Sequence, residues 1–214
     1  MFIIFASLIS RMGIAERKER EKEGMRKRIM DAAFEMFLKE GYTGTSLRLI
    51  AKKIEYSPAT IYLYYKDKDA LFFDIQTRCF DILIAKYKKI EHLPAFERLQ
   101  QIGYVYMDHH IQNPQCFNLV FLLDSPLSEF KRQNRWDKYG NAIGFFKYTV
   151  AECMENKLIN YTDEMEACLE IWGQAHGLIT LVVKRSYEGL GLNEKQAHKL
   201  MKTTWANFLN RIRT

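Results

Sequence analysis

The segment 41–71 reads GYTGTSLRLIAKKIEYSPATIYLYYKDKDAL, and the interpretation of the chain starts from it. Thr45 and Ser46 are N-cap residues that precede an apolar face at helical spacing, formed by Leu47, Ile50, Ala51 and Ile54. This pattern predicts a helix of about two and a half turns. Ser57 can then cap a second short helix, whose first position suits Pro58. Two short helices joined by a tight turn are typical of a helix-turn-helix.

An ordered series of residues around this segment resembles the N-terminal domain of TetR-family transcriptional regulators. The resemblance implies an all-α homodimer, with an N-terminal three-helix DNA-binding domain and a C-terminal helical bundle that binds an effector and dimerises. Pro58 and Ala59 lie in the recognition helix, where members of the family vary, so the operator sequence does not follow from the match. The matching positions are Arg28-Ile29-Met30-Asp31-Ala32-Ala33, Phe37, Gly41-Tyr42, Thr45-Ser46, Ile50-Ala51, Ser57, Thr60-Ile61-Tyr62, Tyr65, Lys68 and Leu71.

The resemblance also implies which residues contact DNA. A recognition helix that begins near Ser57 presents its early exposed side chains to base edges in the major groove. The residues expected to read bases are Arg48, Pro58, Ala59 and Thr60; a bidentate contact from an arginine to guanine contributes about 1–3 kcal/mol of discrimination. The residues expected to hold phosphates are Thr45, Ser46, Tyr62, Tyr64 and Lys68, and Ser57 at the start of the recognition helix completes the predicted DNA-binding set. Ile61 and Tyr65 are expected in the core.

Composition and charge agree with a helical, DNA-binding protein. The 214 residues are 48% hydrophobic and 27% charged, with only 4 prolines. The formal net charge is +6. Residues 11–72 hold 14 basic and 10 acidic side chains and residues 73–214 hold 18 and 16, so most of the excess lies in the smaller N-terminal part. Such an excess suits a surface that faces phosphates.

The four cysteines are widely spaced and include no C-x-x-C pair. This spacing favours free thiols in a reducing cytoplasm over a disulfide or a redox sensor. The cysteines are Cys79, Cys116, Cys153 and Cys168.

The chain is expected to divide into an N-terminal extension, 1–23, a helix-turn-helix domain, 24–70, and an effector-binding and dimerisation domain, 71–214. The apolar residues 1–12 are too short to span a bilayer. Either translation starts at Met12 or these residues form a genuine arm. The charged residues that follow are either a solvated helical lead-in or a basic arm that reaches DNA.

The C-terminal part is predicted to consist of helices only. A helix capped by Asp67 continues to about Ile90, Thr162 is expected to cap the helix 163–185, and Asn193 is expected to cap the last helix. Within the second of these, the run Trp172-Gly-Gln-Ala-His176-Gly resembles a Trp–His–Gly signature of one TetR subgroup.

Aromatic residues are frequent in the middle of the chain. Together with the family resemblance, they predict an effector pocket lined by Tyr106, Phe121, Phe145, Trp172 and His176. Few basic residues face inward, which favours a neutral or cationic, largely apolar effector. His176 is either a buried core histidine or a polar anchor in that pocket. A homodimer interface built as a four-helix bundle is predicted from Ile179, Val183, Leu200, Trp205 and Phe208.

The sequence contains no pattern of catalytic residues. It lacks a G-x-S-x-G motif, a glycine-rich phosphate loop and paired acids near a histidine, so no enzyme and no cofactor are predicted. His109 and His110 lie on different faces of a helix, so no metal site is predicted. The main interpretation is a ligand-responsive regulator, most simply a repressor, that binds a palindromic operator. An architectural DNA-binding protein without effector and a ligand carrier with a vestigial DNA-binding domain remain alternatives.

Overall fold

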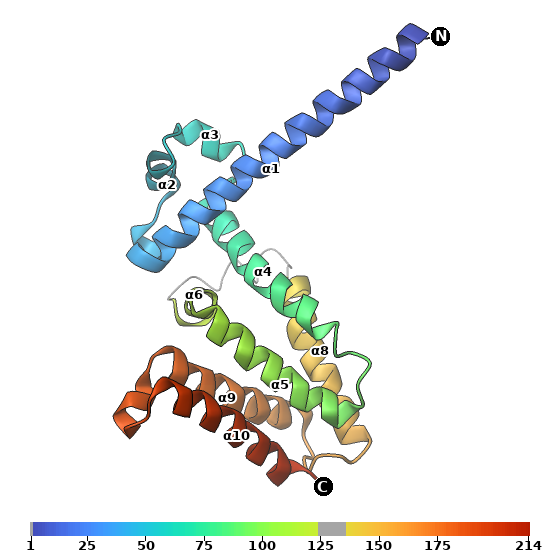
Figure 1. Ribbon diagram of the computed structural model, residues 1–214, viewed down its shortest axis with the longest axis vertical. Helices are drawn as coiled ribbons and strands as arrows, with labels where there is room; N and C mark the ends of the chain where they lie inside the picture. Colours follow the sequence, from blue (N-terminus) through green and yellow to red (C-terminus); the bar gives the residue numbers. More distant parts are fainter. Residues whose placement is uncertain (1, 124–135) are drawn as a thin grey trace. The chain divides into compact units, whose positions relative to one another are not determined.

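The computed structural model describes residues 2–123 and 136–214, and its regular structure there is helical (Figure 1). In addition to the helices, Ile159 and Arg213 form an isolated antiparallel β-bridge. The all-α fold is therefore confirmed. The elements in order are α1 (Phe2–Gly44), α2 (Leu47–Lys53), α3 (Pro58–Tyr62), α4 (Lys68–Tyr87), α5 (Ala95–Gln112), α6 (Pro114–Phe117), the π-helix η1 (Asn118–Leu122), α8 (Trp136–Glu155), α9 (Glu164–Val183), the 3₁₀-helix η2 (Ser186–Leu190) and α10 (Glu194–Ile212).

The described residues form two compact units: 2–75 with Leu123, and 76–122 with 136–214. The boundary falls inside α4, between Ile75 and Gln76, so this one continuous helix contributes to both units. Across the described part of the chain, no helix is both long enough and apolar enough to cross a membrane.

The first unit holds the helix-turn-helix. Its helix α1 begins at Phe2, so the charged residues of the predicted N-terminal extension are part of one helix with the residues that follow them. The regular helix is interrupted at Gly41, whose φ of 74° is a conformation that favours glycine. The hydroxyl of Thr45 donates to the Gly41 carbonyl at 2.8 Å and so fixes this end of the helix.

Three aromatic rings form the core of the first unit between α1 and the start of α4. The Phe72 ring meets the Phe37 and Tyr42 rings edge-on, with centroid distances of 4.8 and 5.1 Å. The Tyr42 hydroxyl donates to Asp69, and the Lys68 ammonium donates to the Tyr42 carbonyl at 2.7 Å. These contacts hold the helix-turn-helix against the first turns of α4.

The second unit is organised around α5, which packs against α8, α9 and α10. Helices α9 and α10 lie side by side (Figure 1). The guanidinium of Arg98, itself buried, joins α5 to α8: its Nε donates to the Thr149 hydroxyl at 3.0 Å, and one terminal nitrogen pairs with Glu152. The other terminal nitrogen donates to the carbonyls of Glu91 and Leu93.

Of the three helix caps predicted after the helix-turn-helix, two are confirmed. Asp67 accepts from the Ala70 amide at 2.7 Å, and Asn193 forms a reciprocal capping box with Gln196. The prediction for Thr162 was wrong, because the next residue, Asp163, caps α9 by accepting from the Glu166 amide at 2.8 Å.

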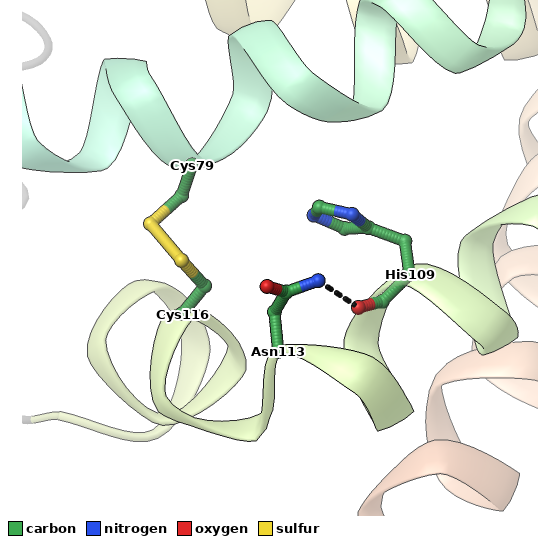
Figure 2. The surroundings of a disulfide bond; sticks show 4 residues. All are labelled: Cys79, His109, Asn113 and Cys116. Carbon is green, nitrogen blue, oxygen red and sulfur yellow. Dashed lines mark hydrogen bonds between the residues drawn. A yellow bond between two sulfur atoms is a disulfide. The ribbon is translucent and has the colours of Figure 1, made fainter.

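The prediction of four free thiols was also wrong. Cys79 on α4 and Cys116 on α6 form a disulfide with their Cα atoms 5.8 Å apart (Figure 2). Cys153 and Cys168 are free and buried. The two cysteines are 37 residues apart in the sequence, and only the packing of α6 against α4 brings their side chains together. Their spacing therefore did not indicate the disulfide.

Candidate DNA-binding surface and effector cavity

Serine caps define the two helices of the helix-turn-helix, as predicted. The Ser46 hydroxyl accepts from the Leu49 amide at the start of α2, and the Ser57 hydroxyl accepts from the Thr60 amide at the start of α3, both at 3.2 Å. Between the helices, Glu55 takes a positive φ of 62°. The caps satisfy amides that a helix leaves unpaired at its N-terminus, so both short helices have defined ends.

The recognition helix α3 is fixed from behind by core residues. Ile61 and Tyr65 are buried, which confirms their assignment to the core. Burial, reinforced by the nearby Asp74 carboxylate, raises the pKa of Tyr65 to about 12. The Arg26 guanidinium lies 5.2 Å from the centroid of the Tyr65 ring, and Arg28 donates to the Ile54 carbonyl at 3.1 Å. These contacts tie α3 and the preceding turn to α1.

Five of the ten residues predicted to contact DNA are exposed. Tyr62 exposes 53% of its surface. Ser46, Thr60 and Tyr64 are half-buried, and the exposed members are Arg48, Ser57, Pro58 and Ala59. Hydroxyls, an arginine and small apolar groups together can meet both phosphates and base edges. Their roles in DNA binding stay predictions.

Two of the predicted phosphate contacts have other partners. Thr45 is buried and its hydroxyl is bonded to Gly41, so we remove it from the DNA-facing set. Lys68 is half-buried, donates to the Tyr42 carbonyl and lies 4.0 Å from the centroid of the Tyr42 ring. Its ammonium therefore has a structural task in addition to any contact with phosphate.

Sequence reasoning missed Leu63, which exposes 81% of its surface directly after α3. Periodicity gives no signal for it, because the helix ends at Tyr62 and its apolar stripe ends with it. Sequence reasoning also passed over Lys52, an exposed cation in the last turn of α2.

The second unit contains an apolar cavity of about 160 Å³. Its walls come from α4, α5, η1, α8, α9 and α10. Of the residues predicted to bind a ligand, Tyr106, Phe121 and Trp172 line it. The remaining lining residues are Phe80, Leu83, Tyr87, Leu99, Ile102, Gly103, Ala142, Ile143, Phe146, Lys147, Met165, Cys168, Leu169, Ile171, Ala175 and Trp205.

Two residues predicted to bind the ligand do not line the cavity. Phe145 stacks on Tyr87, with ring centroids 5.5 Å apart, and does not line the cavity. His176 reaches the wall through Tyr106, whose hydroxyl lies 3.1 Å from its Nδ1, while the Trp172 indole N–H donates to the same hydroxyl at 3.3 Å. Burial lowers the pKa of His176, so its imidazole is neutral near pH 7 and its Nδ1 can accept a hydrogen bond from the Tyr106 hydroxyl.

Lys147 brings a charge to the cavity that the sequence did not predict there. Its ammonium lies 3.6 Å from a Glu164 carboxylate oxygen, and both side chains are half-exposed. Trp205 lines the cavity and donates its indole N–H to the Gln100 carbonyl at 3.2 Å. Helical periodicity places Trp205 on an apolar face but does not distinguish a face buried within one chain from one buried between two.

Three of the five predicted interface residues are buried within a single chain. Ile179, Trp205 and Phe208 lie in the core of the second unit, and Trp205 exposes only 1% of its surface. Val183 is half-buried, and Leu200 exposes 47%. The exposed apolar residues on α9 are Met165, Leu169, Trp172 and Leu181, of which the first three also line the cavity.

Two adjacent histidines lie close to the cavity but outside its wall. Burial lowers the pKa of His109 to about 4, with Lys86 acting in the same direction, and lowers that of His110 to about 3. The His110 ring packs edge-on against the Tyr106 ring at 4.6 Å and the Phe121 ring at 5.6 Å. In the part of the chain that the structure describes, no group of three or more metal-binding side chains comes together.

Residues 29–75 match the family model described as "Bacterial regulatory proteins, tetR family". An "HTH-type transcriptional regulator" of Staphylococcus aureus strain USA300 is 35% identical over 66 residues, which are 31% of this chain and 36% of that protein. The chain thus matches about a third of the length of the curated relatives.

Solved structures resemble nearly the whole chain in fold. The "Clostridium perfringens putative fatty acid metabolism regulator" has a TM-score of 0.68 and 22% identity, covering 86% of this chain and 98% of its own. A TetR family transcription regulator from Marinobacter aquaeolei VT8 has a TM-score of 0.67 and 17% identity, covering 91% and 98%. The family model and the curated relatives support a DNA-binding helix-turn-helix of the TetR type, and the solved structures show a shared fold over most of the chain. They do not confirm the Trp–His–Gly subgroup.

Proposed function

We propose that this protein is a ligand-responsive transcriptional repressor, which binds a palindromic operator as a homodimer and is released by a small, largely apolar effector. The observation that carries the proposal is that one helix, α4, belongs to both functional parts. Its first turns pack on the helix-turn-helix through Phe72 and Asp69, and its later turns supply Phe80, Leu83 and Tyr87 to the cavity.

The exposed face of α2 and α3 supports DNA binding. Arg48 and the first turn of α3 would read base edges, while Ser46, Tyr62, Tyr64 and Lys52 would hold phosphates. As a DNA-binding regulator, the protein would work in the cytoplasm, where bacterial DNA lies.

The cavity supports an effector with little charge. Its lining is almost entirely apolar, and the Tyr106 hydroxyl already contacts Trp172 and His176. Lys147 argues against a cationic molecule and suits one with a single weakly acidic group. An aliphatic chain with one carboxylate would satisfy both features. The name of the Clostridium perfringens relative points to the same class of compound.

Regulation requires that the effector bind better to the state that binds DNA poorly. Two half-sites on one face of DNA are about 34–36 Å apart, so a small change in the separation of two recognition helices is sufficient. Since α4 runs from the cavity into the first unit, displacement of Phe80 or Leu83 by an effector would move the helix that the helix-turn-helix packs on. The expected coupling is roughly 1–3 kcal/mol, or 5–150-fold in operator affinity.

The proposal is tested by selecting bound sequences from a random DNA pool and measuring their affinity by fluorescence anisotropy. A palindromic consensus and a large specificity ratio are expected. Uniform affinity for all sequences would instead indicate an architectural DNA-binding protein. A thermal-shift screen of apolar monocarboxylic acids and neutral lipophilic compounds, followed by competition with the operator, then tests release. Compounds that stabilise the protein without displacing DNA would contradict induction.

A further inference from the structure

The disulfide joins two segments that each supply a ring to the cavity wall. Cys79 is followed directly by Phe80 on α4, and Cys116 on α6 leads into η1, which carries Phe121. Both rings line the cavity and meet edge-on, with centroids 6.1 Å apart. The covalent bond therefore ties together the two parts of the wall that these rings form.

The two sulfurs differ in access. Cys79 exposes only 6% of its residue surface, whereas Cys116 is half-buried. His109 borders the pair from α5 (Figure 2), and the backbone of Cys79 partly opposes the lowering of its pKa by burial. With its pKa lowered to about 4, His109 is neutral near pH 7 and adds no charge beside the two sulfurs, so solvent takes the proton as a thiol ionises. A dissolved reagent would meet Cys116 first.

The proposed DNA-binding function, on which this inference rests, places the protein in a reducing compartment. Lasting disulfides are rare there, and those that form are usually transient and redox-sensing. We propose that Cys79 and Cys116 are a reversible thiol–disulfide site for low-molecular-weight disulfides, and that the bond restricts the cavity to small ligands.

The reaction is thiol–disulfide exchange in two steps. The Cys116 thiolate attacks one sulfur of the small disulfide, which forms a mixed disulfide and releases one small thiolate. The Cys79 thiolate then attacks the Cys116 sulfur and releases the second. In total, two cysteine thiols lose two electrons and two protons, and one small disulfide gains them as two thiols. Excess small thiol reverses both steps.

The bond affects the cavity because the space is small. At about 160 Å³, the bonded form has little room for a multi-ring molecule unless the walls move apart. With the bond broken, α6 and η1 can shift away from α4, and Phe121 can separate from Phe80. The reduced protein should therefore bind bulky apolar ligands more tightly than the oxidised protein.

The experiment uses the full chain, reduced or treated with oxidised glutathione. Free thiols are preserved by acid quenching, alkylated after the protein is unfolded in denaturant at neutral pH, and located by peptide mass spectrometry. Of the four cysteines, all should be alkylated in the reduced protein, but only Cys153 and Cys168 after oxidation. The neutral fluorescent probe N-phenyl-1-naphthylamine then reports on the cavity. Its affinity should be about fivefold higher, or more, for the reduced form, the lower end of typical coupling between sites.

Two variants make the test specific. Cys116→Ser should show the reduced-state affinity whether or not glutathione disulfide is present, and Cys153→Ser, at a buried free cysteine, should respond like wild type. Four alkylated cysteines after oxidation, a lasting glutathione adduct on Cys116, or equal probe affinity in the two states would each overturn the inference. DNA binding by the reduced protein is measured separately, so failure there would refute the proposed function without touching the thiol chemistry.

Discussion

The indole of Trp205 on α10 lies directly against the Cα of Gly103 on α5. A Cβ added at Gly103 would overlap the ring, and Trp205 is held there by donating its indole N–H to the Gln100 carbonyl. This close approach lets a tryptophan form one wall of the cavity, because only a residue without a side chain leaves room for the ring.

Gly103→Ala should therefore destabilise the protein by about 1–3 kcal/mol, since an added methyl group must displace a packed indole. Gly144→Ala is the matched control, because a Cβ at Gly144 on α8 meets no atom within 4 Å. That change should be neutral or should stabilise by roughly 0.5–1 kcal/mol. Urea unfolding followed by circular dichroism measures both. Equal changes in the free energy of unfolding for the two substitutions would show that the Trp205 indole can move aside at little cost.

Arg48→Ala should reduce discrimination among operator variants by about 1–3 kcal/mol at one base position. Tyr62→Phe removes only a hydroxyl and should weaken binding to all sequences alike. Anisotropy with operator variants and with random DNA separates the two, since Arg48→Ala should lower only the preference for the operator, whereas Tyr62→Phe should weaken both alike. Arg185→Ala, on an exposed arginine of the second unit, serves as the control. An Arg48 variant that keeps full sequence preference would exclude base reading by this residue.

Arg98→Ala should destabilise by roughly 3–5 kcal/mol, because it leaves Glu152 and the carbonyls of Glu91 and Leu93 without their buried partner. Arg185→Ala breaks a pair with Glu188 that lies open to solvent, so it should change the stability far less than Arg98→Ala. Denaturant midpoints of the two variants provide the comparison. If the Arg98 variant were as stable as the Arg185 variant, the buried contacts of Arg98 would make no net contribution to the stability of the protein.

Stability should fall as the pH falls below about 6.5. Burial lowers the folded-state pKa of His109 to about 4 and of His110 to about 3, so the unfolded chain binds protons first. Between pH 7.5 and 5, each of the two histidines should lower the free energy of unfolding by about 2 kcal/mol. The protein has its full stability at pH values above the pKa that these histidines have in the unfolded chain. His110→Phe should flatten this dependence, whereas His92→Asn, at an exposed site, should not. A wild-type protein equally stable at pH 7.5 and 5 would refute the effect.

The proposed homodimer interface should involve exposed residues of α9 and α10. We predict that Leu181→Glu with Leu200→Glu gives folded monomers with weakened operator binding, since both side chains are open to solvent in one chain. Ile82→Glu, at a similarly exposed position on α4, is the control and should leave the dimer intact. Trp205→Glu should instead unfold the second unit, because that residue is core. Sedimentation velocity distinguishes these outcomes, and an unchanged dimer in the double variant would rule out this face.

Local pattern was sufficient for the helix-turn-helix. Ser46 and Ser57 cap their helices, and Ile61 and Tyr65 face the core, because caps and helical periodicity depend on residues a few positions apart. The all-α class followed for the same reason. Where a cap had two neighbouring candidates, as at Thr162 and Asp163, the local pattern was insufficient to choose between them.

The sequence by itself therefore determined the helical class, the DNA-binding motif and an apolar, aromatic-rich second part. Only the tertiary structure decided which of those apolar residues meet. It paired Cys79 with Cys116, placed Trp205 against Gly103 inside one chain, and brought Lys147 to the cavity. Helical periodicity shows that a side chain points away from water, but not which helix covers it. That choice depends on contacts between residues far apart in the chain, which no local spacing encodes.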